Sequence, residues 1–110
     1  MNKIWRLMPN EFYEYLNSWK YILIDFRTPE EKIYYWYIEN TDLFIDVYRK
    51  DIVEKILSLD KNKSYLIYCF HWNRTQWVLD FMEKNWFKEV YDLIWWIEYR
   101  ENYNHKLLKD

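Results

Sequence analysis

The apolar positions of this chain fall into short runs that alternate with amphipathic segments. Four runs predict strands, at residues 21–24, 43–46, 65–69 and within 87–93. The run at 21–24 is continuous and shows no polar alternation, which is typical of a strand buried on both faces of its sheet.

Amphipathic segments predict helices at residues 9–18, 29–35, 49–59, 75–84 and 95–101. Pro9 suits the first turn of the first of them. Thr28, Pro29 and Glu31 form a helix start, with Thr28 as the N-cap and Glu31 as its partner in a capping box. The apolar residues expected to face the core are Phe12, Tyr15, Leu16, Ile52, Val53, Ile56, Leu59, Val78, Phe81 and Met82.

Strands that alternate with helices predict an α/β fold with a central, mostly parallel sheet flanked by helices on both faces. The length of 110 residues suits one domain, covering residues 1–110, with one modest core. In such sheets the functional site tends to lie at the carboxyl ends of the strands. Two candidates occupy such ends, Asp25–Arg27 after the first strand and Cys69 after the third.

Cys69 is the chain's single cysteine, and a predicted strand leads directly into it. The helix expected from Thr75 would point its N–H groups and positive dipole end at the thiol. This environment is expected to lower the thiol pKa and to favour a thiolate or an anion attached to it. The alternative is an inert buried thiol, the commoner role of a lone cysteine at a strand end.

Composition and charge exclude several classes of protein. With 51% hydrophobic and 31% charged residues, the chain is typical of neither a disordered nor a membrane-spanning protein, and no secretory signal is evident. A net charge of −2 with interspersed signs gives no basic footprint for nucleic acid. One cysteine cannot form an internal disulfide or a thiolate zinc cage, so we expect a cytoplasmic protein without a metal or other cofactor.

The chain contains no glycine and no alanine, but it has 8 Trp, 12 Tyr and 6 Phe residues. An ordinary protein of this length has roughly eight glycines. The absence of two common small residues indicates an engineered sequence or a systematically altered copy of a natural one. Turns that require a positive φ must then use Asn, Asp or a strained residue. We expect Asn73, Asn85 or Asp92 to take this role in shifted turns.

Four segments, in order and in register, resemble the rhodanese-like domain family. Residues 24–31, I-D-F-R-T-P-E-E, are similar to the family's D-V-R-x-x-x-E stretch. Residues 36–41 occupy the place of G-H-I-x-G-A, and residues 68–75, Y-C-F-H-W-N-R-T, resemble the active-site loop Y-C-x-x-G-x-R-S. Residues 87–97 match F-x-x-V-x-x-L-x-G-G-I.

The departures from the family pattern are systematic. The tryptophans that stand where the family has glycine are Trp36, Trp72, Trp95 and Trp96, and Trp19 and Trp86 extend this pattern. Trp77 and Thr41 stand where alanine is usual, and Tyr37 replaces a histidine. The chain therefore resembles a rhodanese-like domain rewritten without glycine and alanine.

The resemblance implies a sulfurtransferase in which Cys69 carries sulfane sulfur as a persulfide. It implies a small donor such as thiosulfate and a thiol or cyanide as acceptor. The loop expected to cradle the anion through its backbone N–H groups consists of Phe70, His71, Trp72, Asn73, Arg74 and Thr75. Asp25 is the expected ionic partner of Arg74, and Arg27 flanks the same region. His71 is either a cation beside the thiolate or a plain surface residue.

The spacing within the loop separates two kinds of enzyme. Rhodanese-related phosphatases have five residues between cysteine and arginine, whereas four lie between Cys69 and Arg74 here. The shorter loop favours a sulfur-sized anion over a phosphate.

The alternative function is a catalytically weak or inactive rhodanese-fold scaffold, or a module that only binds. Trp72 at the loop glycine position supports this alternative, because glycine sites in such loops often require a strained backbone. We expect no nucleic-acid or membrane partner, and a monomer or weak homodimer, since the many aromatic residues could leave apolar patches exposed.

Overall fold

The computed structural model describes residues 3–18, 20–69, 72–94 and 107–108, and describes residues 34–35, 72–73 and 107–108 by their backbone alone. The strands in these residues are β1 (Lys3–Leu7), β2 (Ile22–Asp25), β3 (Tyr37–Ile38), β4 (Leu43–Phe44), β5 (Ser64–Tyr68), β6 (Glu89–Leu93) and β7 (Leu107–Leu108). The helices are α1 (Pro9–Leu16), α2 (Pro29–Tyr35), α3 (Ile52–Leu57) and α4 (Trp72–Lys84). The predicted helix at 95–101 lies outside the described residues.

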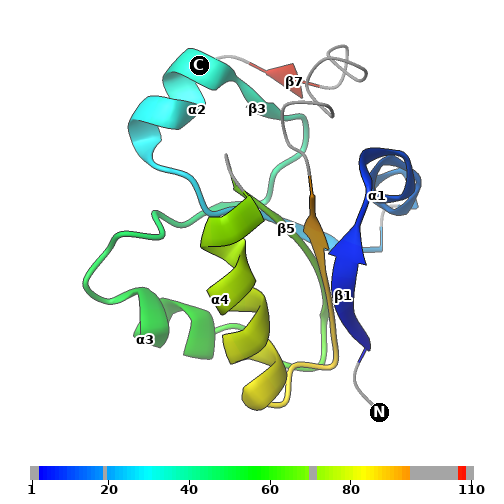
Figure 1. Cartoon of the computed structure of the whole chain (residues 1–110), viewed down its shortest axis with the longest axis vertical. Helices are drawn as coiled ribbons and strands as arrows, with labels where there is room; N and C mark the ends of the chain where they lie inside the picture. The colour runs from blue at the N-terminus through cyan, green and yellow to red at the C-terminus, as the bar shows by residue number, and fades with distance from the viewer. Residues whose placement is uncertain (1–2, 19, 70–71, 95–106, 109–110) are drawn as a thin grey trace.

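The main sheet has five strands in the order β1-β6-β5-β2-β4, and every pairing in it is parallel (Figure 1). The prediction of an α/β fold with a mostly parallel central sheet is confirmed. The sequence pattern missed β1, which lies at the edge of the described sheet and pairs there with β6. Its residues Lys3 and Trp5 are exposed, so no continuous apolar run marks it.

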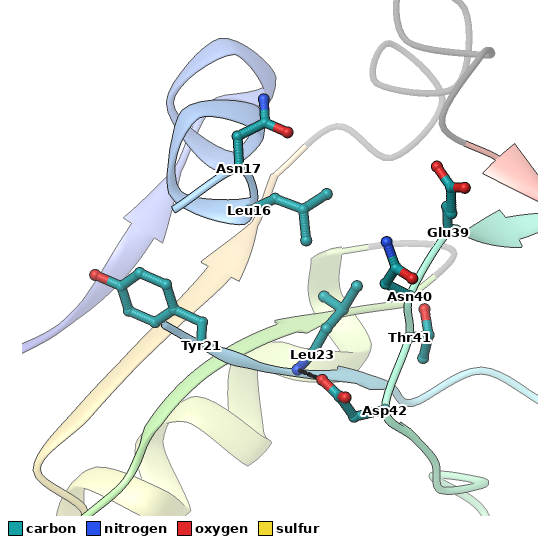
Figure 2. Close-up of a pocket in the computed structure, with 8 residues that line it drawn as sticks. All are labelled: Leu16, Asn17, Tyr21, Leu23, Glu39, Asn40, Thr41 and Asp42. Atoms are coloured by element: carbon teal, nitrogen blue, oxygen red, sulfur yellow. Dashed lines mark hydrogen bonds between the residues drawn. The ribbon is translucent and has the colours of Figure 1, made fainter. Parts of the chain in front are cut away.

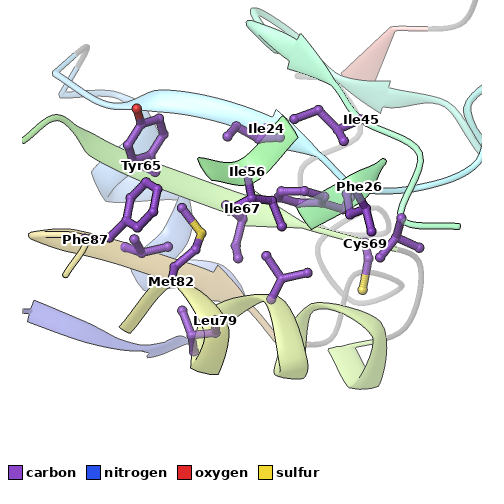
Figure 3. Packing of buried hydrophobic residues seen from close by; sticks show 14 residues of the cluster. Ile24, Phe26, Ile45, Ile56, Tyr65, Ile67, Cys69, Leu79, Met82 and Phe87 are labelled. Carbon is purple, nitrogen blue, oxygen red and sulfur yellow. The ribbon is translucent and has the colours of Figure 1, made fainter. Parts of the chain in front are cut away.

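Helices cover both faces of this sheet, as predicted (Figure 1). On one face α3 and α4 pack on alternate strand residues such as Ile24 and Ile67 (Figure 3). On the other face Phe12 of α1 packs on Leu23 and Leu66. Because side chains alternate along a strand, neighbouring residues of β2 and β5 enter different halves of the core.

Most of the predicted inward-facing residues pack in the core. Val78 and Met82 of α4 are fully buried, whereas Phe81 is partly buried against the same cluster. Val53 was predicted to face inward and is exposed. The physical reason is the direction of the side chains: α3, which spans Ile52–Leu57 rather than 49–59, buries Ile52 and Ile56 four residues apart on one face, and Val53 points away from that face.

The predicted start of α2 is confirmed in detail. Thr28 Oγ1 accepts a hydrogen bond from Glu31 N at 3.3 Å, and Glu31 Oε1 accepts one from Thr28 N at 3.1 Å. These reciprocal bonds, with Pro29 at the first helical position, satisfy N–H groups that a helix otherwise leaves unpaired.

Residues 36–41, predicted as a connection, contain the short strand β3. It pairs antiparallel with β7, with Tyr37 opposite Leu108 and Ile38 opposite Leu107. This pairing joins the C-terminal segment to the middle of the chain.

Three of the described residues have a positive φ: Trp36 at 62°, Asn40 at 67° and Trp86 at 68°. Asn40 suits this conformation because its short polar side chain tolerates it. Trp36 and Trp86 do not, because their Cβ atoms crowd the backbone there. The glycine-free composition therefore places strain on two tryptophans.

The prediction that Asn85 or Asp92 would take a positive φ is wrong, as is that for Asn73, which lies in α4. The end of α4 shows why. Trp86 N–H donates to Glu83 O at 3.3 Å and Phe87 N–H donates to Met82 O at 3.1 Å, the paired bonds of a Schellman motif. The motif requires a left-handed residue at the first of the two donors, directly before the second donor Phe87, and this residue is Trp86.

Replacing Trp86 with glycine should raise the free energy of unfolding by about 1 kcal/mol. Glycine adopts the left-handed conformation without Cβ crowding, and the Trp86 side chain is 78% exposed, so little packing is lost. Urea denaturation followed by circular dichroism measures the change.

Trp77→Gly is the matched control, because Trp77 is a partly exposed tryptophan in the interior of α4. It should lower the free energy of unfolding by about 1 kcal/mol or more, since glycine is a poor helix residue. Destabilisation by both substitutions would show that Trp86 is not strained.

Candidate active site

The carboxyl ends of three adjacent parallel strands place three polar side chains in the interior. Asp25 ends β2, Cys69 directly follows β5, and Asp92 lies near the end of β6. Their exposed fractions are 1%, 1% and 0%. The sheet end that the strand pattern predicted as the functional end therefore carries two carboxyl groups and the thiol.

Cys69 lies on the α4 face of the sheet, in the same apolar cluster as Phe26 and Leu79 (Figure 3). Its Sγ lies 3.4 Å from Thr75 Oγ1, and the backbone N–H groups of Arg74 and Thr75 also interact with the sulfur. The predicted arrangement of a thiol facing the first turn of a helix is thus present.

The predicted lowering of the thiol pKa is wrong. Burial raises the pKa of Cys69 to about 11, and the nearby Asp92 charge adds to the rise. The hydrogen bonds from Thr75 and from the two backbone N–H groups act in the opposite direction but do not compensate. The free energy that the thiolate loses when it is removed from water exceeds the stabilisation that it gains from the helix N-terminus.

Asp25 and Arg27 form a buried ion pair with each other. Arg27 donates from Nε to Oδ1 at 3.0 Å, from Nη2 to Oδ2 at 2.9 Å and from its backbone N to Oδ1 at 2.8 Å. Arg27 Nη2 also donates to Trp36 O, and its guanidinium lies 5.3 Å from the Tyr68 ring. Because Asp25 is the register partner of Tyr68, this pair lies on the Tyr68 side of the sheet end, opposite Cys69.

The expected pair of Asp25 with Arg74 is therefore wrong, because Arg27 already occupies both carboxylate oxygens. Arg74 Nη1 instead donates to Glu31 Oε1, which joins the start of α4 to the start of α2. Burial alone would raise the pKa of Glu31, but hydrogen bonds from Arg74 and Thr28 lower it below its ordinary value. Glu31 was predicted only as a capping residue, although the final E of the D-x-R-x-x-x-E pattern marked it.

The structure shortens the predicted loop. Helix α4 begins at Trp72 rather than at Thr75, so Trp72 and Asn73 are its first residues. Phe70 and His71 lie outside the described residues. The expected cradle is thus represented by the backbone N–H groups of Arg74 and Thr75 in the first turns of α4.

Asp92 is the site residue that sequence reasoning missed. Thr75 Oγ1 donates to Asp92 Oδ1 at 2.7 Å, and Arg6 Nη2 of the unpredicted strand β1 lies 3.6 Å from Oδ2. Burial raises the pKa of Asp92 to about 7, against the lowering effects of Thr75 and Arg6. The available signal was a carboxylate among the apolar residues of β6, because Asp is rarely fully buried unless it is paired, and perturbed buried acids cluster at functional sites.

A cavity of about 430 Å³ lies on the α1 side, between the end of α1, the start of β2 and residues 39–42 (Figure 2). Glu39 and Asp42 contribute carboxylates to its wall, and Asp42 Oδ2 accepts a hydrogen bond from Leu23 N at 2.8 Å. Two carboxylates disfavour an anionic ligand, so this cavity does not suit a thiosulfate-like donor.

The described residues contain no cluster of three or more His, Cys, Asp or Glu side chains that could hold a metal ion. Within the same part of the chain, every helix is too short or too polar to span a bilayer.

Comparisons with a family profile and with known structures point to the same protein family. A profile of the rhodanese-like domain matches residues 8–95. A rhodanese-related protein from Thermoplasma volcanium has a similar structure, with a TM-score of 0.76, 22% identity and coverage of 100% of both chains. A rhodanese-like domain protein from Staphylococcus aureus has a TM-score of 0.63 and 28% identity, and 82% of each chain is covered.

A third similar structure is the polysulfide-sulfur transferase homodimer from Wolinella succinogenes. Its TM-score is 0.75 at 18% identity, over 97% of this chain and 80% of that one. A search of curated protein sequences found no match.

Proposed function

Because the chain belongs to the rhodanese-like domain family, we propose that it transfers sulfane sulfur and that Cys69 carries this sulfur as a persulfide. The observation that carries the proposal is the position of the thiol. Cys69 directly follows the buried parallel strand β5, and its Sγ faces the N–H groups of Arg74 and Thr75 at the start of α4. Such N–H groups stabilise an anion on the sulfur in both the thiolate and the persulfide.

The proposed chemistry is a pair of sulfur-displacement steps. The Cys69 thiolate attacks the outer sulfur of thiosulfate, the S–S bond of thiosulfate breaks, and sulfite leaves with the bonding electrons. The persulfide then gives its outer sulfur to cyanide or a thiol, which regenerates the thiolate. Polysulfide is a second candidate donor, since the similar Wolinella protein is a polysulfide-sulfur transferase.

Neighbouring residues would hold this site in shape. Arg74 is fixed by Glu31, which is itself fixed by the α2 cap, so the start of α4 is held against α2. The Asp25–Arg27 pair ties the end of β2 to Trp36 O. We assign these residues to support of the site rather than to contact with the sulfur.

Cys69→Ser should reduce thiocyanate formation from thiosulfate and cyanide, or from polysulfide and cyanide, to the uncatalysed rate. Serine cannot accept sulfur at neutral pH, and the chain has no other cysteine. Colorimetric detection of thiocyanate measures the rate.

A double variant, Cys69→Ser with Ser58→Cys, is the control for thiol content. Ser58 is an exposed residue that ends α3, so the new thiol is accessible but lies outside the site. We expect no recovery of activity. Equal activity in the wild type and Cys69→Ser would refute the proposal.

The second candidate is a rhodanese-fold scaffold or binding domain without turnover. The raised pKa of Cys69 favours it, because the thiol is then largely protonated at neutral pH. If the wild type forms no thiocyanate with either donor, this second candidate is correct.

We also propose that residues 1–110 form one domain whose sequence was rewritten to exclude glycine and alanine. Pairing of β7 with β3 supports a single unit. The positive φ of Trp36 and Trp86 supports a rewritten sequence, since both sites favour glycine.

A further inference from the structure

Three buried side chains from three elements form a hydrogen-bonded line at the centre of the site. Cys69 follows β5, Thr75 lies in α4, and Asp92 lies in β6. Thr75 Oγ1 gives its proton to Asp92 Oδ1 over 2.7 Å, so the same oxygen, 3.4 Å from Cys69 Sγ, is placed to accept the S–H proton. The contacts define a direction, from thiol to hydroxyl to carboxylate.

The surroundings of this line allow one negative charge more readily than two. The exposed fractions of Cys69, Thr75 and Asp92 are 1%, 0% and 0%. Among the residues that the structure describes, the charged groups facing the line are Arg6 from β1, 3.6 Å from Asp92 Oδ2, and Arg74 from α4, which interacts electrostatically with Cys69 and pairs with Glu31. Two anions in a buried site raise each other's free energy strongly.

We propose that Cys69 and Asp92 share a single negative charge through the Thr75 hydroxyl, so that Asp92 takes up a proton whenever the sulfur becomes an anion. This inference rests on the proposed function, because it states where the thiol proton goes during sulfur transfer. Asp92 is a positioning residue in this scheme, since it acts on the sulfur only through Thr75.

The transfer keeps both hydrogen bonds and reverses their direction. The S–H proton moves to Thr75 Oγ1 while the Thr75 proton moves to Asp92 Oδ1. Afterwards the carboxyl group donates to Thr75, and Thr75 donates to the thiolate. In the resting state the hydroxyl supports the carboxylate, and in the charged state it supports the sulfur anion.

The reaction balances with this proton movement. Cys69–SH and Asp92–COO⁻ become Cys69–S⁻ and Asp92–COOH, with no change in net charge. The thiolate and thiosulfate dianion then give the persulfide anion and sulfite dianion. After the persulfide has given its outer sulfur to cyanide as thiocyanate, the thiolate recovers its proton from Asp92.

The titration behaviour of the two groups supports this linkage. Burial raises the pKa of Asp92 to about 7, so its charge state changes near neutral pH. Burial and the Asp92 charge both raise the pKa of Cys69. Ionisation of Asp92 above pH 7 therefore holds the thiol proton more tightly, and the pair titrates as a coupled unit.

The single cysteine permits a direct test by NMR. Protein labelled with ¹³Cβ-cysteine gives one signal, which is followed from pH 5 upward through the high-pH thiol step, without any sulfur donor. We expect two steps in the wild type, one near pH 7 from Asp92 and one at high pH from the thiol. In Asp92→Asn the first step should vanish and the thiol midpoint should fall by about one pH unit or more, a tenfold rise in thiolate at a given pH.

Two variants of Thr75 test whether the hydroxyl carries the coupling. Thr75→Ser keeps a hydroxyl and should retain the step near pH 7. Thr75→Val removes the hydroxyl at similar volume and should shrink that step markedly. These variants also keep the test decisive if Asp92→Asn does not fold.

Two results would overturn the proposal: a single step in the wild type, or a step near pH 7 of equal size in Thr75→Val. The titration uses protein whose Cys69 carries no persulfide sulfur, so its result does not depend on turnover. A two-step titration without thiocyanate formation would refute sulfur transfer but support the charge sharing. Thiocyanate formation with a single-step titration would support sulfur transfer but refute the charge sharing.

Discussion

Replacing Asp25 with asparagine should lower the free energy of unfolding by about 3–5 kcal/mol. Asp25 and Arg27 have exposed fractions of 1% and 0% at the level of their side chains, and Asp25 receives hydrogen bonds from Nε, Nη2 and the backbone N of Arg27. Asparagine keeps the shape but removes the charge that balances the buried guanidinium. Since a domain of this size has a total stability of about 5–15 kcal/mol, such a loss removes a large part of it.

Asp51→Asn is the matched control, because Arg49 and Asp51 form the same kind of ion pair at the surface. Their Nε–Oδ1 distance is 2.7 Å, but their side chains are 49% and 45% exposed. Water and salt screen this pair, so we expect no measurable change in the urea midpoint. Equal midpoints for Asp25→Asn and Asp51→Asn would mean that the buried pair does not stabilise the fold.

The second large effect concerns Trp36. We expect Trp36→Gly to be more stable than Trp36→Ala by about 1–3 kcal/mol. Trp36 ends α2 with φ 62° and ψ 173°, a region that residues with a Cβ rarely occupy. Both substitutions remove the indole, so their difference isolates the backbone strain. Inside a helix or strand the order is reversed, because a glycine there makes the protein less stable than an alanine does, by about 0.5–1 kcal/mol.

A hydrogen bond explains why Trp36 keeps this conformation. Its carbonyl oxygen accepts from Nη2 of the buried Arg27 guanidinium. The strained peptide thus satisfies a buried cation, and relaxing it would remove that acceptor. The comparison of the two variants by urea denaturation tests the strain, and equal stabilities or a more stable alanine variant would exclude it.

The sequence predicted the parts of the fold that depend on local pattern. Apolar runs located β2 and β5, and Thr28 with Glu31 located the start of α2. Strand β1 was not predicted, because an edge strand with exposed Lys3 and Trp5 needs no apolar run. The positive φ of Trp86 was not predicted, because the paired hydrogen bonds at the end of α4 determine which residue is left-handed, whatever its identity.

The candidate site was predicted less completely, because its energetics depend on depth and on side-chain partners. Cys69 was located correctly at the end of β5, but its pKa depends on burial that no local pattern reveals. Sequence order could not decide between Arg27 and Arg74 as the partner of Asp25. Asp92 gains its importance from Thr75 and Arg6, which reach it from two other elements.

The most direct test of the account is the intact mass of the protein after incubation with thiosulfate or polysulfide and removal of the donor. The account predicts a gain of about 32 Da, one sulfur atom, on the wild type. This gain should be absent in Cys69→Ser and should disappear on addition of cyanide, with release of thiocyanate. No gain with either donor, or the same gain in Cys69→Ser, would contradict the assignment of Cys69 as the sulfur carrier.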